Sequence, residues 1–191
     1  MDIQPVSQPV RSRVLLLLTL GVATGTSHAQ WGWCPFGPQT LAEVEARIAR
    51  QFPDVPQWDP AALATSEHPP VVLDAREPEE YEVSHLSGAI RIGPDASLSD
   101  VPRVLGVAPR GTPILRYCSM DRRRSIMADR IRSGLLADGA SEVANLRGGI
   151  LARAIEGRPL VNANGPTRQI HAFDSYWAKL LPPQVRTFVP E

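Results

Sequence analysis

A cysteine and three arginines lie close together in the segment YCSMDRRRS, residues 117–125. Cys118 ends an apolar run, and Arg122, Arg123 and Arg124 follow it. A thiolate is the reactive form of cysteine, and the N-terminus of a helix stabilises it. Arginine presents a fork of donors that matches the oxygens of sulfonate, sulfate or phosphate. The segment therefore indicates a thiolate beside an anion-binding loop.

Residues 119–124 are expected to turn between a strand and a helix. Successive backbone N–H groups in such a turn form a concave nest that can bind an oxyanion. A simpler interpretation is that Cys118 is a small buried side chain and that the arginines form a solvated face. The position of the arginines directly after the cysteine favours the chemical reading.

Four short apolar runs predict the strands that position this loop: residues 71–74, 88–92, 112–117 and 142–146. Helical segments separate them, which predicts an α/β fold with a mainly parallel central sheet flanked by helices. Cys118 then lies just past the carboxyl end of the third strand, where such sheets bind ligands.

Amphipathic helices are predicted on either side of these strands. In residues 40–52, Leu41, Val44, Ile48 and Phe52 share one face, and Thr40 is a candidate N-cap with glutamate three residues on. Residues 125–139 have helical periodicity and end at a glycine, while residues around 63 and from 78 form shorter helical turns. Three prolines between residues 53 and 60 end the first helix.

Length and composition bound the remaining possibilities. The 191 residues, 43% of them hydrophobic, can bury one full core. Twenty basic side chains balance 20 acidic ones, so nucleic acid is not an expected partner. His68, His85 and His171 stand alone, so no metal or other cofactor is expected, and His85 is interpreted as structural.

The N-terminus has the pattern of a secretory signal peptide, residues 1–29. Arg11 and Arg13 precede an apolar run at residues 14–23, and small residues flank a histidine at 27–29. The run is shorter than the roughly 20 apolar residues that span a bilayer. The mature chain is therefore expected to be periplasmic or secreted, without a stable membrane span. The alternative is an uncleaved membrane anchor.

The loop and two flanking blocks resemble the rhodanese superfamily. The blocks are VVLDAREPEEYEVSHLSGAIRI at residues 71–92 and NLRGGILARAIEGRPLV at residues 145–161. The resemblance implies a rhodanese-like domain over residues 61–161. An N-terminal extension with a helix (30–60) would precede it, and a C-terminal extension (162–191) would follow it.

The resemblance also implies a role for each matching residue. Cys118 would be the nucleophile of a sulfurtransferase and carry sulfane sulfur as a persulfide. Thiosulfate would be the standard donor, and cyanide, a thiol or a protein thiol the acceptor. Asp74 and Arg76 would support the loop from below. The implied substrate-binding residues are Ser119, Met120, Asp121, Arg122 and Arg123, with Arg124 in support.

Two departures from the family pattern, together with the register of the loop, leave alternatives open. One departure is Arg124, which stands where relatives often have serine after the arginine. Asp121 stands where relatives often have glycine, and its carboxylate would weaken thiosulfate binding unless an arginine pairs with it. Arg123 closes a six-residue loop without a gap, whereas Arg124 would close a seven-residue loop like that of dual-specificity phosphatases and arsenate reductases. A third interpretation of the chain is a rhodanese-fold binding module without catalytic activity. Cys34 is either incidental or a disulfide partner of Cys118.

Overall fold

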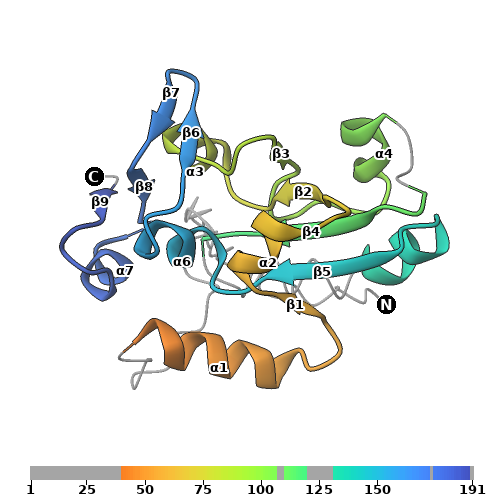
Figure 1. Cartoon of the computed structure of the whole chain (residues 1–191), viewed down its shortest axis with the longest axis horizontal. Coiled ribbons are helices and arrows are strands. Elements are labelled where there is room, and N and C mark those ends of the chain that lie inside the picture. Colours follow the sequence, from red (N-terminus) through yellow and green to blue (C-terminus); the bar gives the residue numbers. More distant parts are fainter. Residues whose placement is uncertain (1–39, 107–109, 120–130, 173, 190–191) are drawn as a thin grey trace, which may run out of the picture. The chain divides into compact units, whose positions relative to one another are not determined.

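A computed structural model of the chain describes residues 40–106, 110–119, 131–172 and 174–189. These residues contain a five-stranded sheet with the strand order β1-β5-β4-β2-β3, in which all neighbouring strands run parallel (Figure 1). The strands are β1 (Gln57–Trp58), β2 (Val71–Asp74), β3 (Ile90–Arg91), β4 (Pro113–Tyr117) and β5 (Glu142–Leu146). The predicted parallel α/β fold is thereby confirmed.

Strand β4 is the centre of this sheet. It pairs with β2 from Ile114 to Tyr117 and with β5 from Pro113 to Arg116. Its last four residues are buried, as expected for a strand covered on both faces. The predicted strand at 88–92 is shorter than expected, because only Ile90 and Arg91 pair with β2.

Strand β1 was not predicted, because it lies among prolines. Gln57 and Trp58 pair with Asn145 and Leu146 at the edge of the sheet. Proline is tolerated at an edge, since one side of an edge strand needs no ladder hydrogen bonds. The carbonyl oxygen of Pro56 even accepts a bond of 2.8 Å from the Asn145 N–H.

Helix α1 (Leu41–Gln51) starts at its predicted signal, and the helix before Gly139 ends at its predicted signal. Helix α1 begins with a capping box, in which the Thr40 side chain accepts from Glu43 N–H and the Glu43 carboxylate accepts from Thr40 N–H. Residues 131–137 are helical, and the positive φ of Gly139 marks the turn after them. The remaining helices are α2 (Pro60–Thr65), α3 (Pro78–Val83), α4 (Asp100–Leu105), α6 (Gly149–Ile155) and α7 (Ser175–Leu180).

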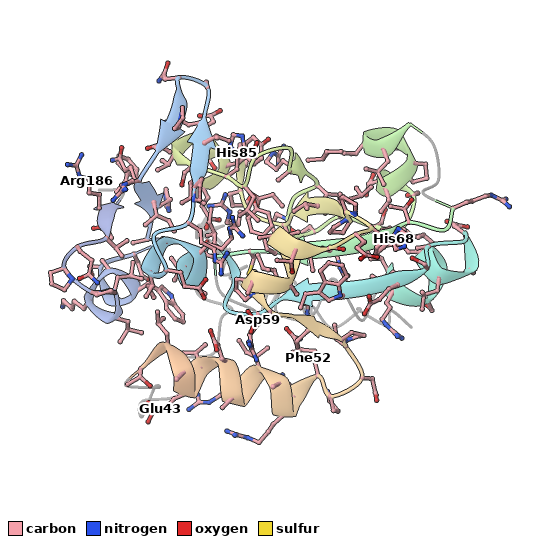
Figure 2. All side chains as sticks on the ribbon, in the orientation of Figure 1. Glu43, Phe52, Asp59, His68, His85 and Arg186 are labelled. Atoms are coloured by element: carbon pink, nitrogen blue, oxygen red, sulfur yellow. The ribbon has the colours of Figure 1, made fainter. Side chains whose placement is uncertain are left out.

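Two apolar cores lie on opposite faces of the sheet, because alternate residues of β4 point to opposite sides. The first core includes Val44, Ile48, Leu115, Tyr117 and Ile150. Phe52, at the end of α1, packs half-buried against it (Figure 2). The second core includes Leu73, Ile114, Cys118, Ile131 and Val143.

The chain after α6 adds two small sheets and α7 (Figure 1). Strands β6 (Leu160–Asn162) and β7 (Gly165–Thr167) are antiparallel, whereas β8 (Gln169–His171) and β9 (Arg186–Phe188) are parallel. Leu160, Ile170, Ala172 and Leu181 from this part belong to the first core. These strands were not predicted from the sequence.

Candidate active site

Cys118 lies directly after Tyr117, the last residue of the central strand β4, as predicted. Its side chain is wholly buried and packs in the second core with Ile114 and Ile131. The Cys118 carbonyl oxygen accepts a hydrogen bond of 3.0 Å from the N–H of Ile150 in α6. Strand β4 and the start of α6 therefore both hold the backbone at this cysteine.

Glycine at position 149 permits this contact with α6. Gly149 has φ +58°, and a Cβ placed there would lie 2.3 Å from the Cys118 carbonyl oxygen and 3.0 Å from that of Ser119. Both neighbouring atoms belong to the backbone and cannot rotate away. Only glycine lets α6 approach the cysteine this closely.

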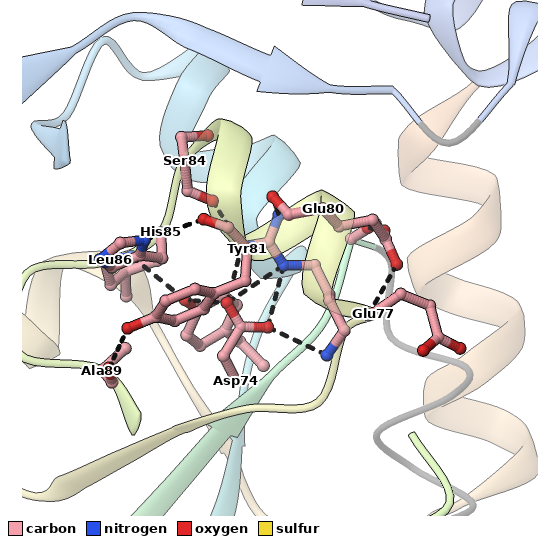
Figure 3. Close-up of polar contacts among 11 residues, drawn as sticks. Asp74, Glu77, Glu80, Tyr81, Ser84, His85, Leu86 and Ala89 are labelled. Atoms are coloured by element: carbon pink, nitrogen blue, oxygen red, sulfur yellow. Dashed lines mark hydrogen bonds and ion pairs between the residues drawn. The ribbon is translucent and has the colours of Figure 1, made fainter. Parts of the chain in front are cut away.

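Asp74, Arg76 and Tyr117 form a buried network at the carboxyl ends of β2 and β4, next to Cys118 in the sequence. Figure 3 shows the polar contacts around Asp74. The Arg76 Nη2 donates to Asp74 Oδ2 over 2.6 Å, and Nε donates to Oδ1 over 2.9 Å. The Tyr117 hydroxyl donates to the same Oδ2 over 2.5 Å and accepts from the Leu86 N–H over 3.1 Å. The Asp74 carboxylate thus joins the end of β2 to the end of β4.

Arg76 connects this network to α3. Its Nη1 donates to the Glu80 carbonyl oxygen over 3.2 Å, and Nη2 donates to that of Ser84 over 2.6 Å. Burial disfavours the charged guanidinium, but the Asp74 carboxylate outweighs this effect, so the pKa of Arg76 is raised above its ordinary value. The side chain therefore holds the last turn of α3 with its charge retained.

Tyr117 is protonated at neutral pH for a clear physical reason. Burial and the adjacent Asp74 carboxylate raise its pKa well above the ordinary value, because a phenolate there would be desolvated and repelled. The Tyr117 hydroxyl therefore keeps its hydrogen and donates it in the hydrogen bond to Asp74. The Arg76 guanidinium carbon lies 5.5 Å from the centre of the Tyr117 ring.

Glu80 contacts the residue that follows the cysteine. Its buried carboxylate accepts from the Ser119 hydroxyl through Oε1 and from the Glu77 N–H, over 3.1 Å, through Oε2. Sequence reasoning missed Glu80 and Tyr117 as parts of the site. A glutamate three residues after the N-cap of a predicted helix signals a capping role, but nothing local indicates the contact with Ser119.

His85 packs within the scaffold, consistent with the structural role interpreted from the sequence. Its ring stacks on that of Tyr81, with centroids 3.8 Å apart and planes 3° from parallel. Its backbone exchanges two hydrogen bonds, of 2.8 and 2.9 Å, with Val161. These contacts join α3 to β6, so His85 belongs to the scaffold that surrounds the site.

The structure thus brings four of the predicted site residues together: Cys118, Ser119, Asp74 and Arg76. Cys34, Met120, Asp121, Arg122, Arg123 and Arg124 lie outside the described residues. Within the described ranges no group of three or more histidine, cysteine, aspartate or glutamate side chains could hold a metal ion. In the same ranges, no helix has the length and apolar character needed to cross a bilayer.

Comparison with known proteins identifies the domain around this site. Residues 59–154, just over half of the chain, match the rhodanese-like domain. A search of curated protein sequences finds no match. The match runs from the loop after β1 to α6 and includes the cysteine, the buried network and Gly149.

Three solved structures illustrate the similarity. A thiosulfate sulfurtransferase from Pseudomonas aeruginosa is 25% identical, with 73% of this chain and 26% of that protein covered and a TM-score of 0.47. The BH2092 protein from Bacillus halodurans is 22% identical, with 63% and 87% covered and a TM-score of 0.46. A polysulfide-sulfur transferase homodimer from Wolinella succinogenes is 17% identical, with 63% and 88% covered and a TM-score of 0.45.

Proposed function

This chain belongs to the rhodanese-like family, and we propose that it is a sulfurtransferase that carries sulfane sulfur as a persulfide on Cys118. The observation that carries the proposal is the position of Cys118 at the carboxyl end of the central strand β4, inside the family match. Ligands of open parallel sheets bind at this edge. Contacts from α6 and from the buried network hold the cysteine backbone there.

The proposed first half-reaction loads the cysteine with sulfur. The Cys118 thiolate attacks the outer sulfur of thiosulfate, a new S–S bond forms, and sulfite leaves with the electrons of the old S–S bond. The product is a cysteine persulfide anion. In the second half-reaction cyanide attacks the outer sulfur, thiocyanate leaves, and the thiolate is regenerated. A thiol acceptor would leave as its own persulfide.

The loop after Cys118 would stabilise the anions in both steps. By resemblance, its backbone N–H groups bind the donor oxyanion, and Arg123 closes the loop around it. Ser119 starts this loop, and its side chain is held by Glu80 on α3. The Asp121 carboxylate would oppose a doubly charged donor, so a singly charged or neutral sulfur donor is an alternative to thiosulfate.

Export is part of the same proposal. Residues 1–29 have the charge and hydropathy pattern of a secretory signal, which supports a periplasmic or secreted mature chain. The acceptor would then be a small molecule or protein thiol of that compartment. Mass determination of the protein recovered from a periplasmic fraction tests the cleavage, since an intact N-terminus there would contradict it.

The mass of the intact, fully reduced protein before and after thiosulfate tests the sulfur transfer. We expect wild-type protein and the control Cys34→Ser to gain one sulfur atom, and Cys118→Ser to gain none. Cyanide should remove the sulfur and release thiocyanate. A reduced wild-type protein that stays unmodified with thiosulfate and with polysulfide would contradict the proposal. Cysteine-dependent hydrolysis of an aryl phosphate would instead indicate the phosphatase-like alternative.

A further inference from the structure

A buried arginine lies two residues before the proposed nucleophile. Arg116 is wholly buried and is one of the largest side chains with no exposed surface. It belongs to the central strand β4, in register with Leu73 of β2 and Asn145 of β5. A cation at the centre of a parallel sheet is unusual, because full burial removes a charged side chain from water.

Strand alternation places Arg116 on the cysteine side of the sheet. Ile114 and Cys118 belong to the second core, whereas Leu115 and Tyr117 belong to the first. Alternate residues share a face, so Arg116 lies between Ile114 and Cys118 on their face. Leu73, its partner in register, also belongs to the second core.

Within the described part of the chain, Asp74, Arg76 and Glu80 lie on the Tyr117 side. Asp74 contacts the Tyr117 hydroxyl, Arg76 pairs with Asp74, and Glu80 contacts Ser119. Arg153 of α6 also interacts electrostatically with Tyr117. The formal charges of Asp74 and Arg76 cancel, which leaves the acidic Glu80 and the basic Arg153 on that side.

The charge on Arg116 is permanent. A guanidinium does not lose its proton in a protein, so this cation persists at every pH at which the chain is folded. The Cα atoms of residues two apart in a strand are about 7 Å apart. If the separation of the guanidinium and the sulfur is of this order and the effective dielectric constant is about 20, one positive charge shifts a titration by about 1 to 2 pH units.

We propose that Arg116 is a positioning residue that favours the anionic forms of Cys118, the thiolate and the persulfide, through its buried positive charge. The proposal rests on the proposed sulfurtransferase function, because that function uses the thiolate. What it predicts directly is the ionisation of the Cys118 thiol. It predicts a pH dependence that a purely structural arginine would not produce.

The test compares Arg116→Met, which removes the buried charge, with Arg103→Met, which removes an exposed one on α4. Both are made with Cys34→Ser, and the ultraviolet absorbance of the Cys118 thiolate is followed against pH, with Cys118→Ser as the blank. We expect the midpoint to rise by about 1 to 2 pH units in Arg116→Met. In Arg103→Met it should stay within about half a unit of the Cys34→Ser parent, because solvent screens an exposed charge. A folded Arg116→Met protein with an unchanged midpoint would overturn the proposal.

A second variant, Arg116→Gln, covers the case in which the methionine variant fails to fold. Its side chain is neutral but polar, so its thiolate midpoint should also rise by about 1 to 2 pH units. A folded Arg116→Gln protein with the midpoint of the Cys34→Ser parent would overturn the proposal.

Sulfur loading separates this proposal from the function on which it rests. If Arg116→Met shifts the thiolate midpoint but the Cys34→Ser parent gains no sulfur, the sulfurtransferase function alone is refuted. If the parent gains sulfur but Arg116→Met leaves the midpoint unchanged, the role of Arg116 alone is refuted.

Discussion

Asp74 is the residue that the other two members of the buried network next to Cys118 both contact. It accepts from Arg76 and from the Tyr117 hydroxyl, and all three side chains are buried. A buried carboxylate is tolerated only when cations and hydrogen-bond donors satisfy it. Losing either side-chain partner would weaken the compensation of this buried charge, so the three residues are expected to act as a unit.

Tyr117→Phe tests this unit through its dependence on pH. The variant removes one donor to Asp74 and the acceptor for the Leu86 N–H, so at neutral pH we expect a loss of about 1 to 3 kcal/mol in the free energy of unfolding. The folded state raises the pKa of Tyr117 above its unfolded value. This contribution is therefore complete below about pH 10 and is lost as pH rises through the folded pKa.

Urea unfolding of wild-type protein and Tyr117→Phe at about pH 8 and about pH 11 measures the effect. The difference between the two proteins should shrink at the higher pH. Tyr81→Phe is the matched control, since its hydroxyl makes one bond, of 2.8 Å, to the Ala89 carbonyl oxygen at a half-buried site. A difference that stays constant with pH would contradict the assignment of the alkaline loss to Tyr117.

At the scale of elements, the contact between β4 and α6 fixes where the cysteine backbone lies. The Ile150 N–H binds the Cys118 carbonyl oxygen at the first turn of α6. That turn begins with two glycines of positive φ, Gly148 and Gly149. The first N–H groups of a helix have no acceptor within the helix, and α6 directs one of them to the end of a strand.

Gly149→Ala tests whether this close approach positions the nucleophile. The new Cβ would clash with the Cys118 and Ser119 carbonyl oxygens, so we expect slower persulfide formation and a loss of stability. Gly157→Ala is the control, because its φ is +65° and a Cβ there meets nothing within 4 Å. The control should cost about 1 to 2 kcal/mol from backbone strain alone, and Gly149→Ala about 1 to 3 kcal/mol more.

Unfolding in urea and the initial rate of sulfur loading are measured on both alanine variants. Equal stabilities and equal rates would show that α6 can shift away from β4 without consequence for Cys118. A slow Gly149→Ala protein beside an unaffected Gly157→Ala protein would support the positioning role.

At the scale of the whole molecule, the core extends beyond the residues that match the family. Helix α1 precedes residue 59, and β6 to β9 follow residue 154, yet both parts place side chains in the first core. Ile170 of β8 has no exposed surface. The rhodanese-like domain of this chain is therefore expected to need both flanking parts for its stability.

Ile170→Ala tests that expectation at one buried position. Removing its side chain should lower the free energy of unfolding by about 2 to 5 kcal/mol, because a cavity is left in the first core. Gln169→Ala, at the exposed neighbouring residue, should stay within about 0.5 kcal/mol of wild type. Equal stability of the two variants in urea would mean that the chain after α6 is dispensable.

Local patterns in the sequence were sufficient to predict much of this protein. Apolar runs predicted the strands of the main sheet except β1, and Thr40 with Glu43 predicted the start of α1. These features depend on neighbours within a few residues, so they can be read from the chain directly. The position of Cys118 at the end of β4 was predictable in the same way.

Tertiary structure alone decided the contacts that surround Cys118. Tyr117 binds Asp74 across 43 residues of sequence, and Ser119 binds Glu80 across 39. Strand β1 pairs with β5, and β8 with β9, between segments that are likewise separated in the sequence. The physical reason is that such contacts depend on which strands become neighbours, and local propensity carries no information about that choice.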